Sequence, residues 1–387
     1  MKVLILGASI AGPALAYWLG RFGIEPTIVE IAPELRTGGN AVDFRGPLHM
    51  GLLERMGVLD ELRAVQTGGT AMRFVDASGA KQMEWPAGLA GGDLEVRRGD
   101  LARVLAGAGA RHTEYLFGDS IAALDEHEGG VDVTFAGGKQ RTFDLVVGAD
   151  GVHSRVRRLT FGPEERFVKH LGYYVATWNT PTVEEDFVLY NEPGRMISTG
   201  RDGAFAVFAS PRIDYDRHDP AAPRRILRER YEGMGWHAPE LLAAIGDDLY
   251  FDQICRVDAP EWTRGRVALV GDAACGATIG GQGTGTALVC AYVLAAELAA
   301  ARGDHRVAFP AYEKRIGRFA RGTQKGGDTT GRFLAPKSDR GIRLRNYLNN
   351  KKWFLDLTFK IAADRATNLE LTAEPLPLRP SDPTGGR

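Results

Sequence analysis

The N-terminal segment contains the feature that most limits the possible fold. Val3–Leu6 is an unbroken apolar run, as expected for a strand that is buried on both faces of a parallel sheet. A small-residue turn follows at Gly7–Gly12, and Pro13 is tolerated because the first helical turn needs no amide donor there. Ala14–Arg21 continues the helix, and Thr27–Glu30 forms a second strand. The order predicts a βαβ unit and therefore an α/β fold.

The turn has the spacing of a dinucleotide-binding loop. The first glycine of such a loop makes the tight turn, and the last lets the helix pack on the strand. Serine occupies the middle position, where it is small enough to donate to a phosphate. The acid that ends the second strand is placed to accept hydrogen bonds from a ribose. The predicted nucleotide-binding residues are Gly7, Ser9, Ile10, Ala11, Gly12 and Glu30.

The rest of the chain alternates between buried strands, helices and a β-rich insert. Helices are predicted at 47–65, from 101, at 222–247 and at 284–302, a hairpin at 71–86, strands at 131–135, 144–148 and 267–270, and an antiparallel sheet at 170–210. We expect the segments 1–30, 144–148 and 267–270 to assemble into one sheet, with 170–255 as a second layer. Residues 374–387 are rich in proline and glycine and are expected to fray.

Two later segments repeat the pattern of a buried strand that ends in an acid at a turn. In the first, Asp150-Gly151 follows the strand, and a helix capped near Ser154 comes next. In the second, Gly271-Asp272 follows the strand, and a glycine-rich loop at 280–285 runs into the long helix. Main-chain amides at such helix starts can face a polar ligand.

Composition excludes several classes of protein. Lys plus Arg total 48 and Asp plus Glu total 49, so the chain is not a general binder of nucleic acid or anionic membranes. Three cysteines without a CxxC pair do not suit a secreted disulfide framework. We expect neither a signal peptide nor an apolar run near the roughly 20 residues of a membrane span, and therefore a cytoplasmic protein without membrane insertion. The 49 glycines among 387 residues predict many close backbone approaches.

Taken in this order, the three motifs resemble those of the class A flavoprotein monooxygenases, the para-hydroxybenzoate hydroxylase superfamily. The resemblance covers roughly residues 1–320 and is nearest to the single-domain bacterial branch of tetracycline-inactivating and aromatic-polyketide hydroxylases. It implies an α/β fold: a Rossmann-like FAD-binding domain of the GR2 type, an inserted antiparallel-sheet substrate domain and a C-terminal helical segment.

The implied domain boundaries follow from this resemblance. The FAD-binding domain comprises 1–70, 97–166 and 256–325, the substrate domain 71–96 and 167–255, the C-terminal helices 326–374, and the tail 375–387.

The resemblance also implies roles for particular residues. Asp272 matches the aspartate that holds the ribityl chain of FAD, and Asp150 belongs to a motif that touches both FAD and the reductant. Arg98 matches an arginine that contacts FAD, and Arg45 one near the flavin on the route of the nicotinamide. The loop before the long helix adds Gly281, Gln282, Gly283 and Thr284 as cofactor-binding residues.

The chemistry implied is hydroxylation of an aromatic or polycyclic small molecule, such as a secondary metabolite or antibiotic. NADPH or NADH, binding transiently, would reduce non-covalent FAD, and a C4a-hydroperoxide formed with O₂ would transfer oxygen. The family places prolines after its Gly-Asp-Ala-Ala motif, whereas this chain has 275–279 without proline. This loop leaves open a flavin reductase or non-redox cyclase that transfers no oxygen. A further alternative, of another class, is a nucleotide-sensing or partner-binding protein that uses the fold without turnover.

Several residues with reactive or charged side chains are expected to have structural rather than catalytic roles. We expect His153 to be a surface or capping residue, and Cys275 to be a small filler rather than a covalent flavin link or nucleophile. Arg155, Arg157 and Arg158 form either a solvated helix face or a site for the NADPH phosphate. No metal site is predicted from the spacing of His, Cys and Asp. No catalytic acid or base is assigned.

Overall fold

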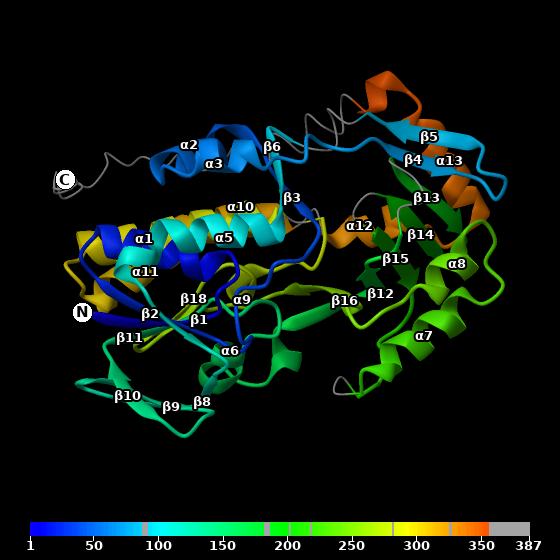
Figure 1. The fold of residues 1–387 in the computed structure, drawn as a ribbon. Coiled ribbons are helices and arrows are strands. Elements are labelled where there is room, and N and C mark those ends of the chain that lie inside the picture. Colours follow the sequence, from blue (N-terminus) through cyan, green and yellow to red (C-terminus); the bar gives the residue numbers. More distant parts are fainter. Residues whose placement is uncertain are drawn as a thin grey trace.

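The computed structural model describes residues 1–86, 92–181, 186–200, 203–216, 219–280, 282–324 and 327–355. Within them the chain forms two large sheets that lie side by side, each with its own helices (Figure 1). The predicted tail at 374–387 lies outside the described residues.

The first sheet is assembled from segments that are far apart in the sequence. Its strands in spatial order are β17 (Thr263–Arg264), β18 (Val267–Leu269), β11 (Leu145–Gly148), β1 (Lys2–Leu6), β2 (Glu25–Glu30) and β7 (Glu114–Phe117). All neighbours are parallel except β17 and β18. Val3 lies opposite Leu145 on one side and Pro26 on the other. The predicted joining of the three strand segments is confirmed, and so is the α/β class.

Helices cover one face of this sheet and a small sheet covers the other (Figure 1). The helices are α1 (Ala11–Arg21), α5 (Arg98–Gly109), α10 (Gly283–Ala300) and α11 (His305–Gln324). The small sheet contains β8 (Ile121–His127), β9 (Gly130–Phe135) and β10 (Gln140–Phe143). A ribbon of β3 (Ala41–Phe44) and β6 (Leu94–Arg97) leads to α2 (Gly46–Arg55) and α3 (Leu59–Ala64).

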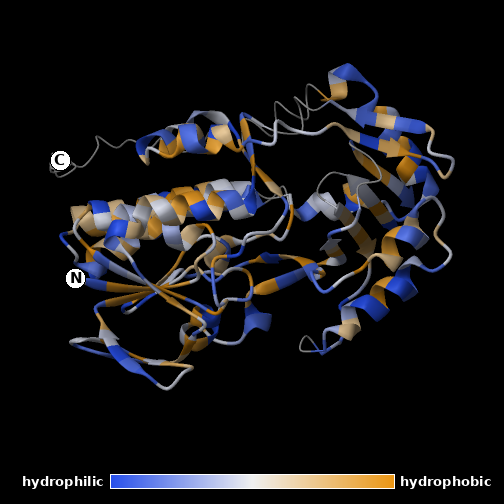
Figure 2. Ribbon diagram, in the orientation of Figure 1, coloured by the Kyte–Doolittle hydropathy of each residue, from blue (hydrophilic) through white to orange (hydrophobic). Residues whose placement is uncertain are grey.

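Helix α10 corrects one expectation. Among the described residues it is the helix whose length and composition would suit a membrane span, although the sequence was expected to contain no such segment. Of its apolar window, 72% is buried inside the protein, where it packs between α1 and α11. Figure 2 shows it as a largely apolar helix within the helical layer, which explains its composition as that of a core helix.

The second sheet forms the other half of the molecule. Its spatial order is β16 (Tyr250–Val257), β12 (Val168–Trp178), β15 (Gly203–Ala209), β14 (Arg195–Gly200), β13 (Phe187–Glu192), β4 (Met72–Val75) and β5 (Lys81–Trp85). The predicted hairpin and antiparallel sheet are present, but β4 joins β13 in parallel. Helices α7 (Ala221–Tyr231) and α8 (Ala238–Ala243) cover one face, while α12 (Gly327–Leu334) packs against β12, β15 and β16. Helix α13 (Asp339–Asn349) packs against β5 and β13.

Strand alternation divides the aromatic residues of this sheet as expected. Tyr174, Trp178, Tyr190 and Phe208 lie in the core beneath α7 and α8. Tyr173, Phe187 and Phe205 lie on the opposite face. On that face Phe187 and Phe205 are only partly buried, with ring centres 6.1 Å apart.

Two predicted helices are each divided in the structure. The segment 47–65 forms α2 and α3, separated at Gly57, whose positive φ of 71° ends the first helix. The segment 222–247 forms α7 and α8, with Gly233 (φ 69°) between them. Apolar periodicity continued across both breaks, so it concealed them.

Candidate active site

The turn after β1 has the conformation that its glycines suggested. Gly7 has a φ of 112°, and a Cβ on Gly12 would overlap the carbonyl oxygen of Gly7. Both positions therefore require glycine. Ile10 occupies the N-cap of α1, and no described side chain caps this helix. Its first amides are left available to an anion.

Glu30 is fixed beside this turn. Its Oε2 accepts a 2.8 Å hydrogen bond from the amide of Ala8, and its Oε1 accepts one of 3.0 Å from the amide of Ala32. Each carboxylate oxygen can still accept a further donor, which is what a ribose contact would need.

Asp150 is engaged with its own helix, α6 (Arg155–Thr160). Its carboxylate accepts hydrogen bonds from the Ser154 hydroxyl at 2.5 Å and from the amides of Arg155 and Val156 at 2.6 and 3.2 Å. The pKa of Asp150 is raised above its ordinary value because burial is the largest effect, and these hydrogen bonds offset only part of it. Ser154 also caps α6 as predicted, because its hydroxyl accepts from the amide of Arg157.

Asp272 has the opposite environment. It begins α9 (Asp272–Cys275), and among the described residues nothing donates a hydrogen bond to its carboxylate. Burial raises the pKa of Asp272, and the charge of Arg98 partly offsets this effect. The residue is only partly buried, so its carboxylate is accessible to a bound group that donates hydrogen bonds.

The start of α10 adjoins this carboxylate. A Cβ on Gly283 would lie 3.1 Å from Oδ1 of Asp272. Gln282 is the N-cap residue, and its buried Oε1 has no hydrogen-bond partner in the described part of the chain. Thr284 lies in the first helical turn, whereas Gly281 falls outside the described residues.

Close backbone approaches bring the three motifs together. A Cβ on Gly7 would lie 2.6 Å from the carbonyl oxygen of Ala149, which joins the first motif to the second. A Cβ on Gly271 would lie 3.2 Å from the Cβ atoms of both Ala11 and Ala287, so this residue joins the third motif to α1 and α10. The surplus of glycine therefore includes positions where separate motifs touch.

Two predicted arginines lie in different surroundings. Arg98 donates from Nη2 to the Ser9 hydroxyl at 3.2 Å, and its charge also acts on Asp272. It therefore lies close to the first motif and within electrostatic reach of the third. Arg45, at the N-cap of α2, forms a 2.5 Å ion pair with Asp43.

The proline-free loop after Asp272 is fixed to the second sheet. The Thr278 hydroxyl donates to the carbonyl oxygen of Gln253 at 3.0 Å and accepts from the amide of Cys255 at 3.1 Å. Ala277 forms an isolated β-bridge with Arg256. Hydrogen bonds to β16 thus restrain this proline-free segment.

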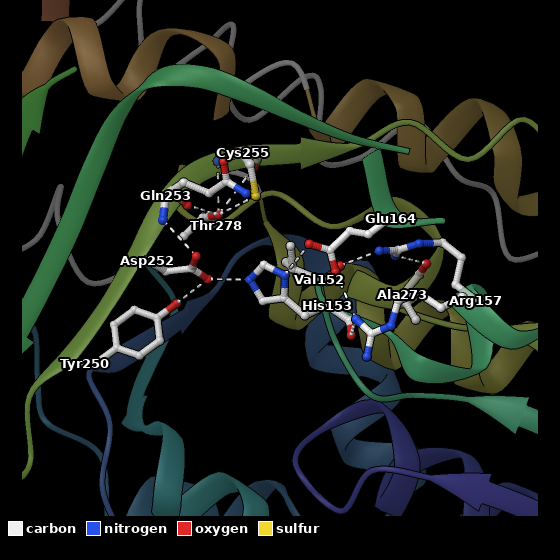
Figure 3. Close-up of polar contacts among 11 residues, drawn as sticks. Val152, His153, Arg157, Glu164, Tyr250, Asp252, Gln253, Cys255, Ala273 and Thr278 are labelled. Carbon is white, nitrogen blue, oxygen red and sulfur yellow. Dashed lines mark hydrogen bonds and ion pairs between the residues drawn. The ribbon is translucent and has the colours of Figure 1, made fainter. Parts of the chain in front are cut away.

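In the basic run, Arg157 does not lie on a solvated helix face, whereas Arg158 is exposed. Arg157 is completely buried and donates to the carbonyl oxygens of Ala273 and Val152 at 2.8 and 2.5 Å (Figure 3). Burial lowers its pKa, which the carboxylates of Glu164 and Asp150 oppose. It therefore connects the second motif to the third inside the protein. Arg158 pairs with Glu164 at 3.1 Å.

His153 also differs from the expectation of a surface or capping residue. Its Nδ1 lies 3.0 Å from Glu164 Oε1, and its Nε2 lies 2.9 Å from Asp252 Oδ2 on β16. The second motif is thereby linked to the second sheet. The sequence hides this link because Asp252 is distant in the chain; the alternation of Tyr250 and Asp252 on one strand face was the available signal.

Comparison with known proteins assigns the family. The FAD binding domain family matches residues 1–309, most of the chain. The chain belongs to this family. It is 40% identical over 341 residues to an uncharacterized protein of Mycobacterium tuberculosis, covering 83% of this chain and 91% of that protein. It is 37% identical over 340 residues to a flavin-dependent monooxygenase from an unknown prokaryotic organism, covering 84% and 87%.

A solved structure agrees with this assignment. The tetracycline destructase Tet(51) superposes with a TM-score of 0.82 and 32% sequence identity, over 94% of this chain and 97% of that one. The chain is therefore a class A flavoprotein monooxygenase, and the resemblance of its motifs to that group is confirmed.

The residues present suit the FAD of this family. The uncapped N-terminus of α1 suits a pyrophosphate, and the unpaired carboxylate of Asp272 suits the hydroxyls of a ribityl chain. The buried, unpartnered Oε1 of Gln282 lies in the same region as Asp272. The individual cofactor contacts remain predictions.

Proposed function

We propose that this protein uses NAD(P)H and O₂ to hydroxylate an aromatic or polycyclic small molecule that carries polar substituents. The observation that carries the proposal is the meeting of the three motifs at Gly7 and Gly271, next to a carboxylate without a donor at Asp272. Bound FAD would accept a hydride from the nicotinamide and activate O₂.

The protein's own residues would bind and orient the reactants. Gly7–Gly12 and the start of α1 would hold the pyrophosphate, Glu30 the ribose, and Asp272 the ribityl chain. The partly buried rings of Phe187 and Phe205 would supply an apolar wall for a planar substrate. Enclosure of the reactants there would exclude water from the reaction.

The tetracycline destructase relationship supports a polycyclic, oxygen-rich substrate, which we extend to this chain as part of the proposal. The alternative of a flavoprotein without oxygen transfer was motivated by the proline-free loop. Because Thr278 and Ala277 attach that loop to β16, its lack of proline is weaker support for the alternative.

The direct test is NAD(P)H oxidation by the purified flavoprotein with a panel of aromatic polyketides and tetracyclines. We expect at least one compound to stimulate oxidation and to gain 16 Da, the mass of one oxygen atom. Protein that binds no flavin on reconstitution would contradict the proposal. Substrate-stimulated oxidation without any oxygenated product would favour the reductase alternative.

A further inference from the structure

Helix α13 and the turn after it carry exposed apolar side chains that the proposed function does not use. Leu344 and Tyr347 are 59% and 61% exposed, and Trp353, just beyond the helix, is 63% exposed. They are three of the eight large apolar residues that are exposed in the described part of the chain, and they fall within ten consecutive positions. Single exposed apolar residues are ordinary on a protein surface, whereas a cluster of them marks an interaction site.

Basic side chains lie among these apolar residues. Arg340 and Arg343 are exposed and share one face of the helix with its two exposed apolar residues, because the four positions have helical spacing. Lys351 continues this face, since its Nζ lies 4.7 Å from the centre of the Tyr347 ring. Residues 339–353 contain five Lys or Arg and one Asp, a net charge of +4, whereas the whole chain has −1. The outer face of α13 therefore combines apolar contact area with an excess of positive charge.

The cations of this face are not neutralised by acidic neighbours. Among the residues that the structure describes, no ion pair involves the four exposed cations of the segment, which are Arg340, Arg343, Lys351 and Lys352. By contrast, the exposed Arg225 of α7 pairs with Asp219 at 2.9 Å. The positive charge on the outer face of α13 is therefore available to an anionic partner.

The inner side of α13 holds the helix in place. Arg345 is buried, and it donates to the carbonyl oxygen of Phe333 at 2.8 Å and to Oδ1 of Asn191 at 3.0 Å. Its Cζ also lies 4.4 Å from the centre of the Phe74 ring. The helix lies beside β5 at the outer edge of the second sheet (Figure 1). An anchored helix, rather than a loop, therefore presents the exposed face.

The chemistry of this face matches that of a lipid interface. Helices that lie in the interface combine Leu, Phe or Trp with Lys and Arg, and the rings of Tyr and Trp settle at the depth of the headgroups. Cations next to an anionic leaflet are attracted to its lipids. We propose that α13 docks this protein on anionic membranes as a peripheral protein, with Leu344, Tyr347 and Trp353 among the headgroups. Such docking needs neither a positive charge on the whole chain nor a spanning segment.

Two other partners fit this face less well. A second copy of the chain would place like charges opposite each other in a symmetric pair. An acidic protein would satisfy the cations, but it would also have to supply fitted apolar pockets for Tyr347 and Trp353. A bilayer accepts these rings without a fixed geometry, so the combination of charge and exposed rings favours lipid.

The test uses the full FAD-loaded chain with two kinds of vesicle, phosphatidylcholine alone and phosphatidylcholine with about 30 mol% phosphatidylglycerol. Sedimentation with the vesicles measures binding. We expect at least about a hundredfold preference for the anionic vesicles at about 0.1 M salt and a much smaller one at about 0.5 M, where charges are screened. Tryptophan emission should shift to shorter wavelength on binding, and Trp353→Phe should abolish most of that shift.

Further variants separate charge from apolar contact. The double variant Arg340→Gln/Arg343→Gln should weaken binding to anionic vesicles about 25-fold, since each cation near the surface contributes about fivefold. Leu344→Asn should weaken it about tenfold, with the salt dependence retained. Arg225→Gln/Arg228→Gln is the matched control, because it removes two exposed cations from another surface helix, α7, and it should bind as the wild type does. All these variants should keep the wild-type Tm, because the altered side chains are exposed.

Several outcomes would overturn the inference. Equal affinity for the two vesicles, binding to neither, or binding that survives Arg340→Gln/Arg343→Gln would each do so. Binding of polyglutamate as tight as that of anionic vesicles would assign the face to an acidic protein instead. A dimer that Leu344→Asn dissociates, without vesicle binding, would assign it to a second copy of the chain.

Discussion

The two sheets of this protein differ in how their functional residues are encoded. Around the first sheet, the decisive positions are glycines within short motifs, where one backbone touches another, as Gly7 touches Ala149. On the second sheet, the role of a residue depends on which face of the strand its side chain occupies. Phe205 and Phe208 are three residues apart on β15, yet they lie in clusters on opposite sides of the sheet. A local pattern therefore identifies the first kind of position, and only tertiary packing identifies the second.

This difference predicts that substitutions at the motif glycines act through the backbone. Gly12→Ala should have the largest effect, because its Cβ would overlap the carbonyl oxygen of Gly7. We expect loss of FAD binding and of most soluble, folded protein, measured by flavin absorbance per polypeptide. In Gly51→Ala, the control in α2, the added Cβ has no neighbour within 4 Å, so a gain of about 1 kcal/mol in stability is expected. Equal flavin content in the two variants would contradict the prediction that Gly12 acts through its close approach to the Gly7 backbone.

Substitutions on the two faces of the second sheet should have different effects. Phe208→Ala should lower the free energy of unfolding by about 3–5 kcal/mol, because the ring is almost fully buried beneath α7. Phe205→Ala removes a partly exposed ring, so it should cost less stability and raise the KM for the substrate. Thermal unfolding and steady-state kinetics separate the two effects. Similar losses of stability at both positions would contradict the assignment of faces.

Substitution of Asp272 tests whether FAD binding at the first sheet depends on a side chain as well as on the backbone of the glycine motifs. Asp272→Ala should weaken FAD binding by about 1–3 kcal/mol, because an acceptor for ribityl hydroxyls is removed. Fluorescence titration of the apoprotein with FAD measures this change. Asp125→Asn, on the exposed edge of β8, is the control and should bind FAD normally. Unchanged affinity in Asp272→Ala would mean that this carboxylate does not hold the cofactor.

Thr278 lies where the two regions meet, and we expect it to show the smallest effect. Thr278→Val retains the shape but loses the hydroxyl that bonds to Gln253 and Cys255. A loss of about 1 kcal/mol in stability is expected, with more NADH consumed per oxygenated product. Thr278→Ser should restore both values towards those of the wild type. If valine and serine behave alike, the hydroxyl does not fix the loop.

Much of the fold could be predicted because burial on both faces leaves a readable pattern. The apolar runs at β1, β11 and β18 identified the strands of the first sheet, although they lie far apart in the chain. Breaks inside apolar periodicity were missed, as at Gly57 and Gly233, since a turn that preserves the periodicity gives no signal. The basic run at Arg157 was misread because a guanidinium that bonds to carbonyl oxygens can be buried.

The sequence by itself determined the cofactor motifs of this protein and the family to which it belongs. Those motifs depend on backbone conformation over a few consecutive residues, where glycine is required for steric reasons. Only the tertiary structure decided how Tyr250, Asp252 and His153 are joined, because their contacts arise when strand β16 packs against the second motif. His153 and Asp252 are separated by 99 positions, so no local pattern encodes their contact.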